Sequence, residues 1–277
     1  MQNIFDTHAH YCSRQFDADR AELLAALPAG GVVGVLECAT HSGDAPKAVE
    51  LAHRLPYFHA AVGIHPESLI EEDAPTVTVY HGDWRAELEA LRPLFEDKAV
   101  VAVGEIGLDH HWPVPRQDQY ELFEAQLQLA AELDLPVSVH DREAHAEMYE
   151  LLRKYKPRGV LHCYSGSAED AAWLTGQGMY LGFGGATTYK GAKRAARVLA
   201  AIDPRWAVLE TDCPYMAPDP VRGRRNDSRN IAHVAAYIGT IWQMDAQAVL
   251  DRTAENARRC FNICLLYTSD AADDLTR

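Results

Sequence analysis

The strongest constraint on the fold of this chain is a regular alternation of short apolar runs with longer amphipathic stretches. Short apolar runs are typical of buried strands, and spaced Leu, Ala and charged residues between them, as in residues 117–133, are typical of helices. Strand and helix alternating eight times predict an α/β protein with a (β/α)8 barrel, although a doubly wound open sheet remains the alternative. The eight runs are residues 3–8, 32–36, 58–62, 100–105, 136–140, 159–162, 180–183 and 207–210.

One domain is expected to contain all eight units. Single barrels commonly reach the length of this chain, so residues 1–262 are interpreted as one domain. We interpret residues 71–83 as the one long irregular insertion. The helical period is lost after Phe261, and the polar, acidic residues 263–277 are predicted to be a non-native or disordered tail.

The charge of the chain limits how it could bind nucleic acid. A formal net charge of −14 argues against passive wrapping, which depends on Lys and Arg neutralising phosphates and releasing counterions. A phosphate-bearing substrate would have to be bound locally. Basic residues that could do this, or could equally form a solvated surface, are Lys190, Lys193, Arg194, Arg197 and the 222–225 segment.

Targeting signals and cysteine patterns indicate a cytoplasmic protein. No segment approaches the roughly 18 consecutive apolar residues of a membrane span, so no membrane partner is expected. The N-terminus lacks the basic and apolar regions of a signal peptide. The six cysteines are scattered without a Cys-x-x-Cys pair, and we expect them to be reduced and mostly buried.

Ionisable residues cluster at the carboxyl ends of six of the eight runs. In a barrel these ends converge on one rim, where active sites of this fold are built. Two residues on the first run, separated by one position, would share a strand face. Imidazole nitrogen and carboxylate oxygen together suit divalent cations. The residues at these ends are His8, His10, His65, Glu105, His140, His162 and Asp212.

Six motifs in this order resemble the TatD family of metal-dependent deoxyribonucleases, and the resemblance covers residues 1 to about 262. Any one of the motifs alone would be a much weaker signal. The motifs are Asp6-Thr-His-Ala-His10, Gly63-Ile-His-Pro66, Gly104-Glu-Ile-Gly-Leu-Asp109, Val139-His-Asp-Arg142, His162-Cys-Tyr-Ser-Gly166 and Glu210-Thr-Asp-Cys-Pro-Tyr215.

The resemblance implies a binuclear metal site and a nucleic acid substrate. One divalent cation would be held by His8, His10 and Asp212, the other by His140 and His162, with Glu105 bridging both. Magnesium or manganese would suit these ligands, with zinc as a further option. The substrate would be DNA, single-stranded or at its ends, cleaved with exonuclease character. The oligomeric state is left open.

Residue chemistry predicts roles for the other groups at the rim. A pair of cations can activate water for in-line attack on a phosphodiester. Asp212 could accept or orient the proton of that water, Glu105 would be the catalytic bridge, and His65 and Arg142 could bind phosphate oxygens. The chain departs from the family pattern at Tyr11-Cys12 and at Glu67, which leaves substrate preference open.

Supporting roles are predicted for residues beside the ligands. Asp6 would orient an imidazole or bond a strand end, and Asp109, Glu210 and Tyr164 would support loop bases. Cys163 and Cys213 are expected to face away from the rim. A weaker hypothesis is that aromatic side chains in the rim loops stack on a base, the candidates being Tyr11, Trp112, Tyr189 and Tyr215.

Two other functions compete with the nuclease. The same rim could activate water against a carbonyl carbon, as in an amidohydrolase, lactonase or aminoacyl-ester deacylase. Many binuclear amidohydrolases carry a carbamylated lysine after the fourth strand, where this chain has Glu105. A non-catalytic metal-binding protein is the third alternative.

Overall fold

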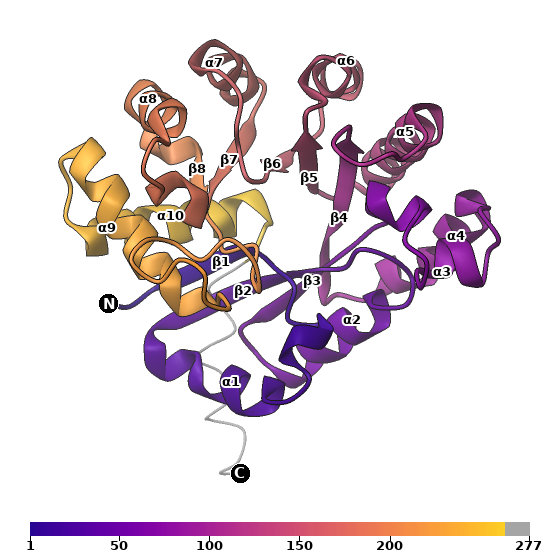
Figure 1. Ribbon diagram of the computed structural model, residues 1–277, viewed down its shortest axis with the longest axis horizontal. Coiled ribbons are helices and arrows are strands. Elements are labelled where there is room, and N and C mark those ends of the chain that lie inside the picture. Colours follow the sequence, from indigo (N-terminus) through magenta and orange to yellow (C-terminus); the bar gives the residue numbers. More distant parts are fainter. Residues whose placement is uncertain (264–277) are drawn as a thin grey trace, which may run out of the picture.

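Eight parallel strands form the wall of a barrel in the computed structural model, which describes residues 1–263 (Figure 1). Each strand pairs with the next one along the chain. This sequential order confirms the (β/α)8 prediction, because a doubly wound sheet reverses its strand order at a switch point. The strands are β1 Ile4–Ala9, β2 Val32–Cys38, β3 Phe58–Val62, β4 Val100–Asp109, β5 Val137–Arg142, β6 Gly159–Leu161, β7 Met179–Phe183 and β8 Ala207–Leu209.

The barrel closes where the segment after β8 meets the end of β1. Ala9 and Cys213 form a parallel bridge. The amide of His10 donates to the carbonyl of Cys213, and the amide of Asp212 donates to the carbonyl of His8, both at 2.9 Å. The closure therefore places His8, His10 and Asp212 at one point of the rim.

Helices surround the strand wall on its outer side (Figure 1). Side chains such as Leu127, Leu151 and Val198 are buried between these helices and the strands. The α-helices are α1 Arg20–Ala26, α2 Ala45–Arg54, α3 Pro75–Thr78, α4 Trp84–Leu91, α5 Arg116–Leu133, α6 His145–Tyr155, α7 Ala168–Gly176, α8 Lys193–Ala201, α9 Ile231–Trp242 and α10 Ala246–Cys260.

Helix α5 begins one residue before its predicted start and ends where the sequence predicts. Its apolar residues Leu122, Phe123 and Leu127 lie on the face that is buried against the barrel. The helix stops at Asp134, which has a left-handed φ of 52°, and Pro136 cannot continue the helical hydrogen bonding.

Two predicted boundaries are corrected by the structure. Strand β4 continues four residues past Glu105, because Ile106 to Asp109 keep pairing with β5. Residues 71–83 contain helix α3, so they are not the one long irregular insertion. A longer stretch without helix or strand is residues 210–227, where three prolines, Pro214, Pro218 and Pro220, each lack a backbone donor.

Other predictions are tested only in part. In residues 1–263, no helix is both long and apolar enough to cross a membrane. Within the same range, Cys12, Cys38, Cys163, Cys213 and Cys260 are free thiols. Apart from Ile263, the predicted tail lies outside the described residues, so its nature stays a prediction.

Candidate metal centre

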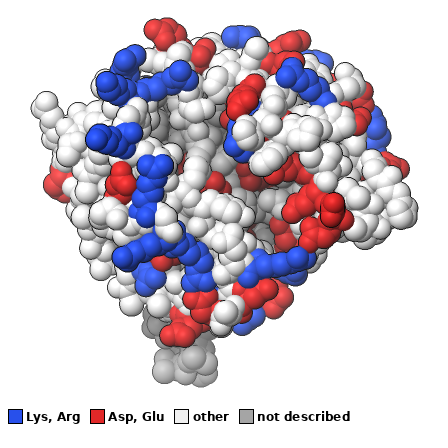
Figure 2. All heavy atoms as spheres, viewed as in Figure 1, with Lys and Arg blue, Asp and Glu red and all other residues white. Residues whose placement is uncertain are grey.

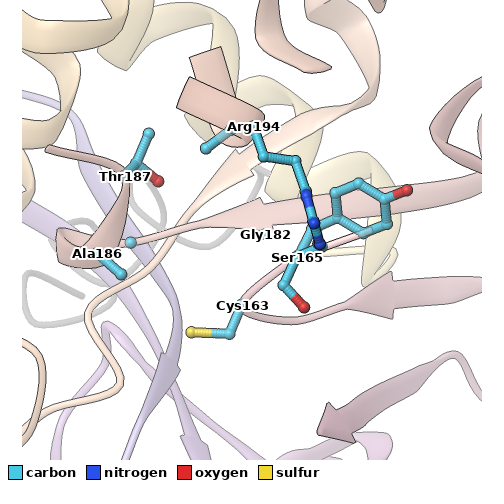
Figure 3. A pocket seen from close by; sticks show the side chains of 9 residues that line it. Cys163, Ser165, Gly182, Ala186, Thr187 and Arg194 are labelled. Carbon is cyan, nitrogen blue, oxygen red and sulfur yellow. The ribbon is translucent and has the colours of Figure 1, made fainter. Parts of the chain in front are cut away.

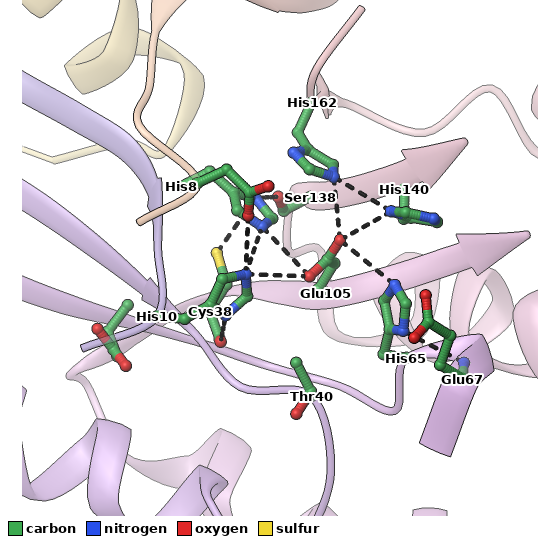
Figure 4. Close-up of polar contacts among 12 residues, drawn as sticks. His8, His10, Cys38, Thr40, His65, Glu67, Glu105, Ser138, His140 and His162 are labelled. Carbon is green, nitrogen blue, oxygen red and sulfur yellow. Dashed lines mark hydrogen bonds and ion pairs between the residues drawn. The ribbon is translucent and has the colours of Figure 1, made fainter. Parts of the chain in front are cut away.

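The carboxyl ends of the strands bring the six predicted metal ligands into one largely buried cluster. Figure 4 shows Glu105 among four of the histidines, with His65 beside them. His8 lies within β1, Glu105 within β4 and His140 within β5. The other ligands lie in the segments that directly follow β1, β6 and β8, and these are His10, His162 and Asp212.

Glu105 stands at the middle of the cluster, and its two oxygens face different imidazoles. Oε2 lies 3.2 Å from Nε2 of His8 and 3.4 Å from Nε2 of His10. Oε1 lies 3.1 Å from Nδ1 of His140 and 3.0 Å from Nε2 of His162. One carboxylate therefore joins two groups of nitrogen atoms that come from opposite sides of the barrel.

Asp212 completes the first of these groups. Its Oδ1 lies 3.3 Å from Nε2 of His10. Ligand atoms of His8, His10 and Asp212 all lie within 4.8 Å of one another, close enough to share one cation. Burial would raise the pKa of the Asp212 carboxyl, but the imidazole of His10 outweighs burial and lowers that pKa.

Glu105 is an anion despite being 4% exposed. Burial on its own would raise the pKa of this carboxyl. The facing imidazoles of His8, His65 and His162 reverse that effect and hold the pKa well below its usual value. The centre therefore carries a buried negative charge that needs a cationic partner.

The hydrogen bonds of His10 show that its inward nitrogen needs a cation. Nδ1 lies 2.8 Å from the carbonyl oxygen of Cys38, which only accepts, so we assign the ring proton to Nδ1. Nε2 then presents a lone pair to the carboxylates of Asp212 and Glu105. Either a proton or a metal ion must lie between these atoms.

His140 repeats this arrangement on the other side of the cluster. Its Nε2 lies 3.0 Å from Oδ2 of the buried Asp109, so Nε2 carries the proton and Nδ1 is left facing Glu105. Burial would lower the pKa of His140, but Asp109 and Glu105 raise it to about 10. Asp109 bonds the loop that follows β4 through the amides of His111 and Trp112, which is the role predicted for it. It also fixes the tautomer of His140, one of the two roles predicted for Asp6.

These donors fit a pair of divalent cations. Imidazole nitrogens and carboxylate oxygens converge, and burial lowers the pKa of His8 to about 4, which leaves this ring neutral and able to ligate. Burial would also lower the pKa values of His10 and His140, but the facing carboxylates raise them, so these imidazoles would give up a proton to a bound cation. Nδ1 of His8 is held at 3.0 Å from Oγ of Ser138. Ser138 was missed at the sequence level, although it precedes His140 by two positions and so shares its strand face.

His65 differs from the ligands in the atom that it presents. The amide of Glu67 donates to Nδ1 of His65 at 3.2 Å, which assigns the ring proton to Nε2. Nε2 lies 3.6 Å from Oε1 of Glu105. His65 thus offers an N–H donor to the centre, which suits a phosphate oxygen better than a cation.

Two glutamines of α5 fix the backbone beside the cluster. Gln126 accepts from the amide of Ile64 at 2.7 Å and donates to its carbonyl at 3.0 Å. Gln119 makes the same pair of bonds with Asp109, at 2.7 and 3.0 Å. Both glutamines are fully buried. Gln119 was missed at the sequence level, although it lies two helical turns before Gln126 and so on the same face of α5 as the apolar residues of that helix.

Asp6 bonds the strand end and not an imidazole ring. Its carboxylate accepts from the amide and hydroxyl of Thr211 and from the hydroxyl of Ser228. These bonds anchor the segment that carries Asp212. Burial raises the pKa of Asp6 to about 6, even though each of these hydrogen bonds lowers it.

Two predictions for rim side chains are wrong. Tyr11 is fully buried and bonds Ser228 through its hydroxyl, so it cannot stack on a base. Cys163 does not face away from the rim, because its φ of 47° breaks the strand alternation and turns it into a cavity beside His162. Cys213 is buried as predicted.

The remaining rim candidates stay accessible. Trp112 is 46% and Tyr215 is 54% exposed. The guanidinium of Arg142 lies 5.8 Å over the ring of Trp112. Within residues 1–263, no ion pair or side-chain hydrogen bond joins Arg142 to the cluster. Its predicted contact with phosphate would require the exposed side chain to turn inward.

Sequence comparisons show what the chain is similar to. The family model described as TatD related DNase matches residues 5–262. The chain is 34% identical over 264 residues to the uncharacterized metal-dependent hydrolase YabD of Bacillus subtilis, covering 94% of this chain and 99% of YabD. It is 32% identical over 272 residues to the 3′-5′ ssDNA/RNA exonuclease TatD of Erwinia tasmaniensis, covering 94% and 100% of the two chains.

Solved structures share the same fold. The crystal structure of YJJV, a TatD homologue from Escherichia coli, superposes with a TM-score of 0.84 at 29% identity and covers 95% of this chain and 99% of YJJV. A TatD family hydrolase from Entamoeba histolytica gives a TM-score of 0.80 at 18% identity and covers 94% and 98%, a likeness that concerns the fold alone.

Proposed function

Because the chain belongs to the family of TatD-related DNases, we propose that it hydrolyses phosphodiester bonds in single-stranded nucleic acid, removing nucleotides from an end. The observation that carries this proposal is the position of Glu105, whose two oxygens each face a separate set of imidazole nitrogens. The 3′-5′ exonuclease named among its relatives supports the choice of substrate and end.

Two divalent cations are the proposed cofactors. His8, His10 and Asp212 would hold one, and His140 and His162 the other, with Glu105 between them. Imidazole and carboxylate ligands without thiolate suit borderline and hard divalent cations, so magnesium or manganese is proposed, and zinc could occupy the same atoms. When bound, such cations supply neutralisation of phosphate charge and a water molecule of lowered pKa.

The side chains around the cluster would orient the substrate and move protons. Asp212 would accept the proton of the attacking water, because its lowered pKa keeps it ionised and only one of its oxygens faces His10. His65 would donate its Nε2 proton in a hydrogen bond to a non-bridging phosphate oxygen. Arg142, which lies over Trp112 in this structure, would turn inward from the rim to bind another phosphate oxygen.

A panel of substrates tests the proposal on metal-stripped protein reloaded with manganese. The substrates are a labelled single-stranded oligonucleotide, bis(p-nitrophenyl) phosphate and p-nitrophenyl acetate. We expect cleavage of both diesters, with the oligonucleotide shortened stepwise from its 3′ end. Glu105→Gln should lower both diesterase rates about 100-fold or more, whereas the exposed Glu50→Gln should change neither.

Two outcomes would contradict the nuclease. Hydrolysis of the acetate ester with intact diesters would assign the same centre to carbonyl chemistry. Bound metal without turnover of any of the three substrates would indicate a non-catalytic metal-binding protein.

The cytoplasmic location stays a prediction.

A further inference from the structure

A cavity of about 300 Å³ opens beside His162, between the loop that follows β6 and the start of α8 (Figure 3). Its volume is at the lower end of the range typical of small-molecule sites. Cys163, Gly182, Thr187 and Arg194 are among the residues that line it. The roles proposed above for the cluster do not use this cavity.

The inner wall of the cavity is next to the metal centre. Cys163 directly follows His162, and its amide donates to Oε1 of Glu210 at 2.5 Å. The same oxygen lies 3.8 Å from Nδ1 of His162. Gly182 leaves room for this carboxylate, since a Cβ there would lie 2.1 Å from its Oε2. A group inside the cavity would therefore lie one side chain away from a proposed ligand.

Arg194 reaches across the outer part of the cavity (Figure 3). Its Nη1 donates to the carbonyl of Ser165 at 3.2 Å, which holds the side chain in place. A guanidinium has five N–H donors, so most of them remain for an anion. No carboxylate in residues 1–263 forms an ion pair with this arginine.

Basic residues continue outward from Arg194. Lys190, Lys193 and Arg197 belong to α8 and the residues just before it. Arg222, in the loop after β8, lies 4.0 Å over the ring of Tyr189 and so joins this surface. That loop is fixed to the same wall, because the amide of Asp219 donates to Oγ1 of Thr188 and the hydroxyl of Tyr189 donates to the carbonyl of Ala217. Among the described residues, none of these four basic side chains is in an ion pair.

The opposite side of the rim carries negative charge. Figure 2 shows Lys and Arg gathered on the side of α8 and α9, and Asp and Glu gathered across the central hollow. Acidic residues after β3 and β5 belong to the opposite side, and they include the exposed Glu71, Glu72 and Glu143, whereas Asp73 is paired with Arg14. A polyanion leaving the centre would be repelled there and attracted towards α8, although the chain as a whole carries a charge of −14.

We propose that the cavity holds the nucleotide next to the scissile phosphate on the retained strand, with Arg194 bound to the following phosphate and the strand continuing over α8. This inference rests on the proposed function and deepens it, because it assigns a specificity-determining site to the same centre. Small residues such as Gly182 and Ala186 leave room in the cavity for a base or sugar, and the guanidinium of Arg194 is available for a phosphate. Longer strands would gain further contacts with Lys193, Arg197 and Arg222.

Binding to metal-stripped protein tests the proposal without catalysis. Fluorescence anisotropy would follow a labelled ten-nucleotide single-stranded DNA as salt is varied. Arg194→Gln should weaken binding about tenfold, which is the loss expected for one charge-assisted hydrogen bond. It should also reduce the slope of log K against log salt concentration by about 0.7, the value for one phosphate contact on a single strand. Arg252→Gln removes the same charge from an exposed position on α10, next to Asp251, which accepts from the side chain of Asn3 just before β1, and should change neither value.

Kinetics of the metal-loaded enzyme separate the cavity from the reaction centre. Arg194→Gln and the cavity-filling Ala186→Phe should raise KM for the oligonucleotide several-fold while changing kcat little, whereas Arg252→Gln should change neither constant. An Arg194→Gln protein that binds and cleaves DNA like Arg252→Gln would overturn the inference. If the unaltered protein cleaves no diester, the proposed function fails, yet the difference in DNA affinity between the two arginine variants still decides the role of the cavity.

Discussion

Gln119 and Gln126 lie seven residues apart on α5, and each side-chain amide satisfies both backbone polar groups of one residue beside the candidate metal centre. Gln126 holds Ile64, the neighbour of His65, and Gln119 holds Asp109, the partner of His140. A single helix on the outside of the barrel thus positions the loops after two different strands.

We expect Gln119→Leu to destabilise the protein by about 2–4 kcal/mol, because it leaves a buried amide and a buried carbonyl without partners. The melting temperature should fall by several degrees. Differential scanning calorimetry would measure this change. The matched control is Gln128→Leu on the exposed side of α5, which should leave the melting temperature within about 2 °C. Equal effects of the two substitutions would contradict the role of Gln119.

Asp109→Asn should weaken cation binding at the cluster by about 10–100-fold, because it removes the charge that fixes the tautomer of His140. Titration of the stripped protein with manganese, followed by calorimetry, would give the affinity. Asp118→Asn, exposed in the first turn of α5, is the control and should bind manganese with unchanged affinity. An unchanged affinity in Asp109→Asn would show that the imidazole does not depend on this carboxylate.

Chelation should lower the thermal stability of the protein as well as its activity. Cations that bind only the folded state stabilise it, by about 2.7 kcal/mol at a concentration one hundred times the dissociation constant. We expect the melting temperature to fall with EDTA and to recover with added manganese. Glu105→Gln should remove most of this dependence, and a full manganese response in that variant would argue against Glu105 as the bridge.

His59 should make the protein less stable in mild acid. Burial lowers the pKa of this imidazole to about 4, whereas in the unfolded chain it is near its usual 6.5. Below pH 6.5 the unfolded state takes up a proton that the folded state refuses until about pH 4, so the free energy of unfolding falls through this window. His59→Leu should remove about 2 kcal/mol of the loss between pH 7 and pH 5. Urea titrations at both pH values would measure it, with the exposed His233→Leu as the control.

The fold was predictable because buried strands appear in the sequence as short apolar runs and the helices between them as longer stretches of regularly spaced apolar residues. The ends of the strands were less predictable, since Ile106 to Asp109 extend β4 only through pairing with residues that lie about thirty positions further along the chain. That pairing also places Gly107 against the backbone of His140, where a Cβ would lie 2.0 Å from the carbonyl oxygen. Tertiary contacts of this kind leave no local pattern.

The clustering of the candidate ligands was predictable from residue type and position at strand ends, whereas only some of the side chains that support them were. Asp109 and Glu210 stood inside recognisable motifs. Ser138 and Gln119 carry no charge, and their importance follows only from which imidazole or backbone group lies next to them. The error for Tyr11 arose because the chain turns inward directly after His10, a change of direction that strand alternation cannot predict.

The junction between the first and last strands has a consequence for synthesis of the protein. His8 and His10 leave the ribosome early, but their partner Asp212 emerges only after three quarters of the chain has been made, and its amide bonds His8 where the barrel closes. A nascent chain, or one truncated before β8, therefore contains His8 and His10 without Asp212, the third member of their group. Tight binding of a cation at the proposed site would therefore require that β8 has been synthesised and that the barrel has closed.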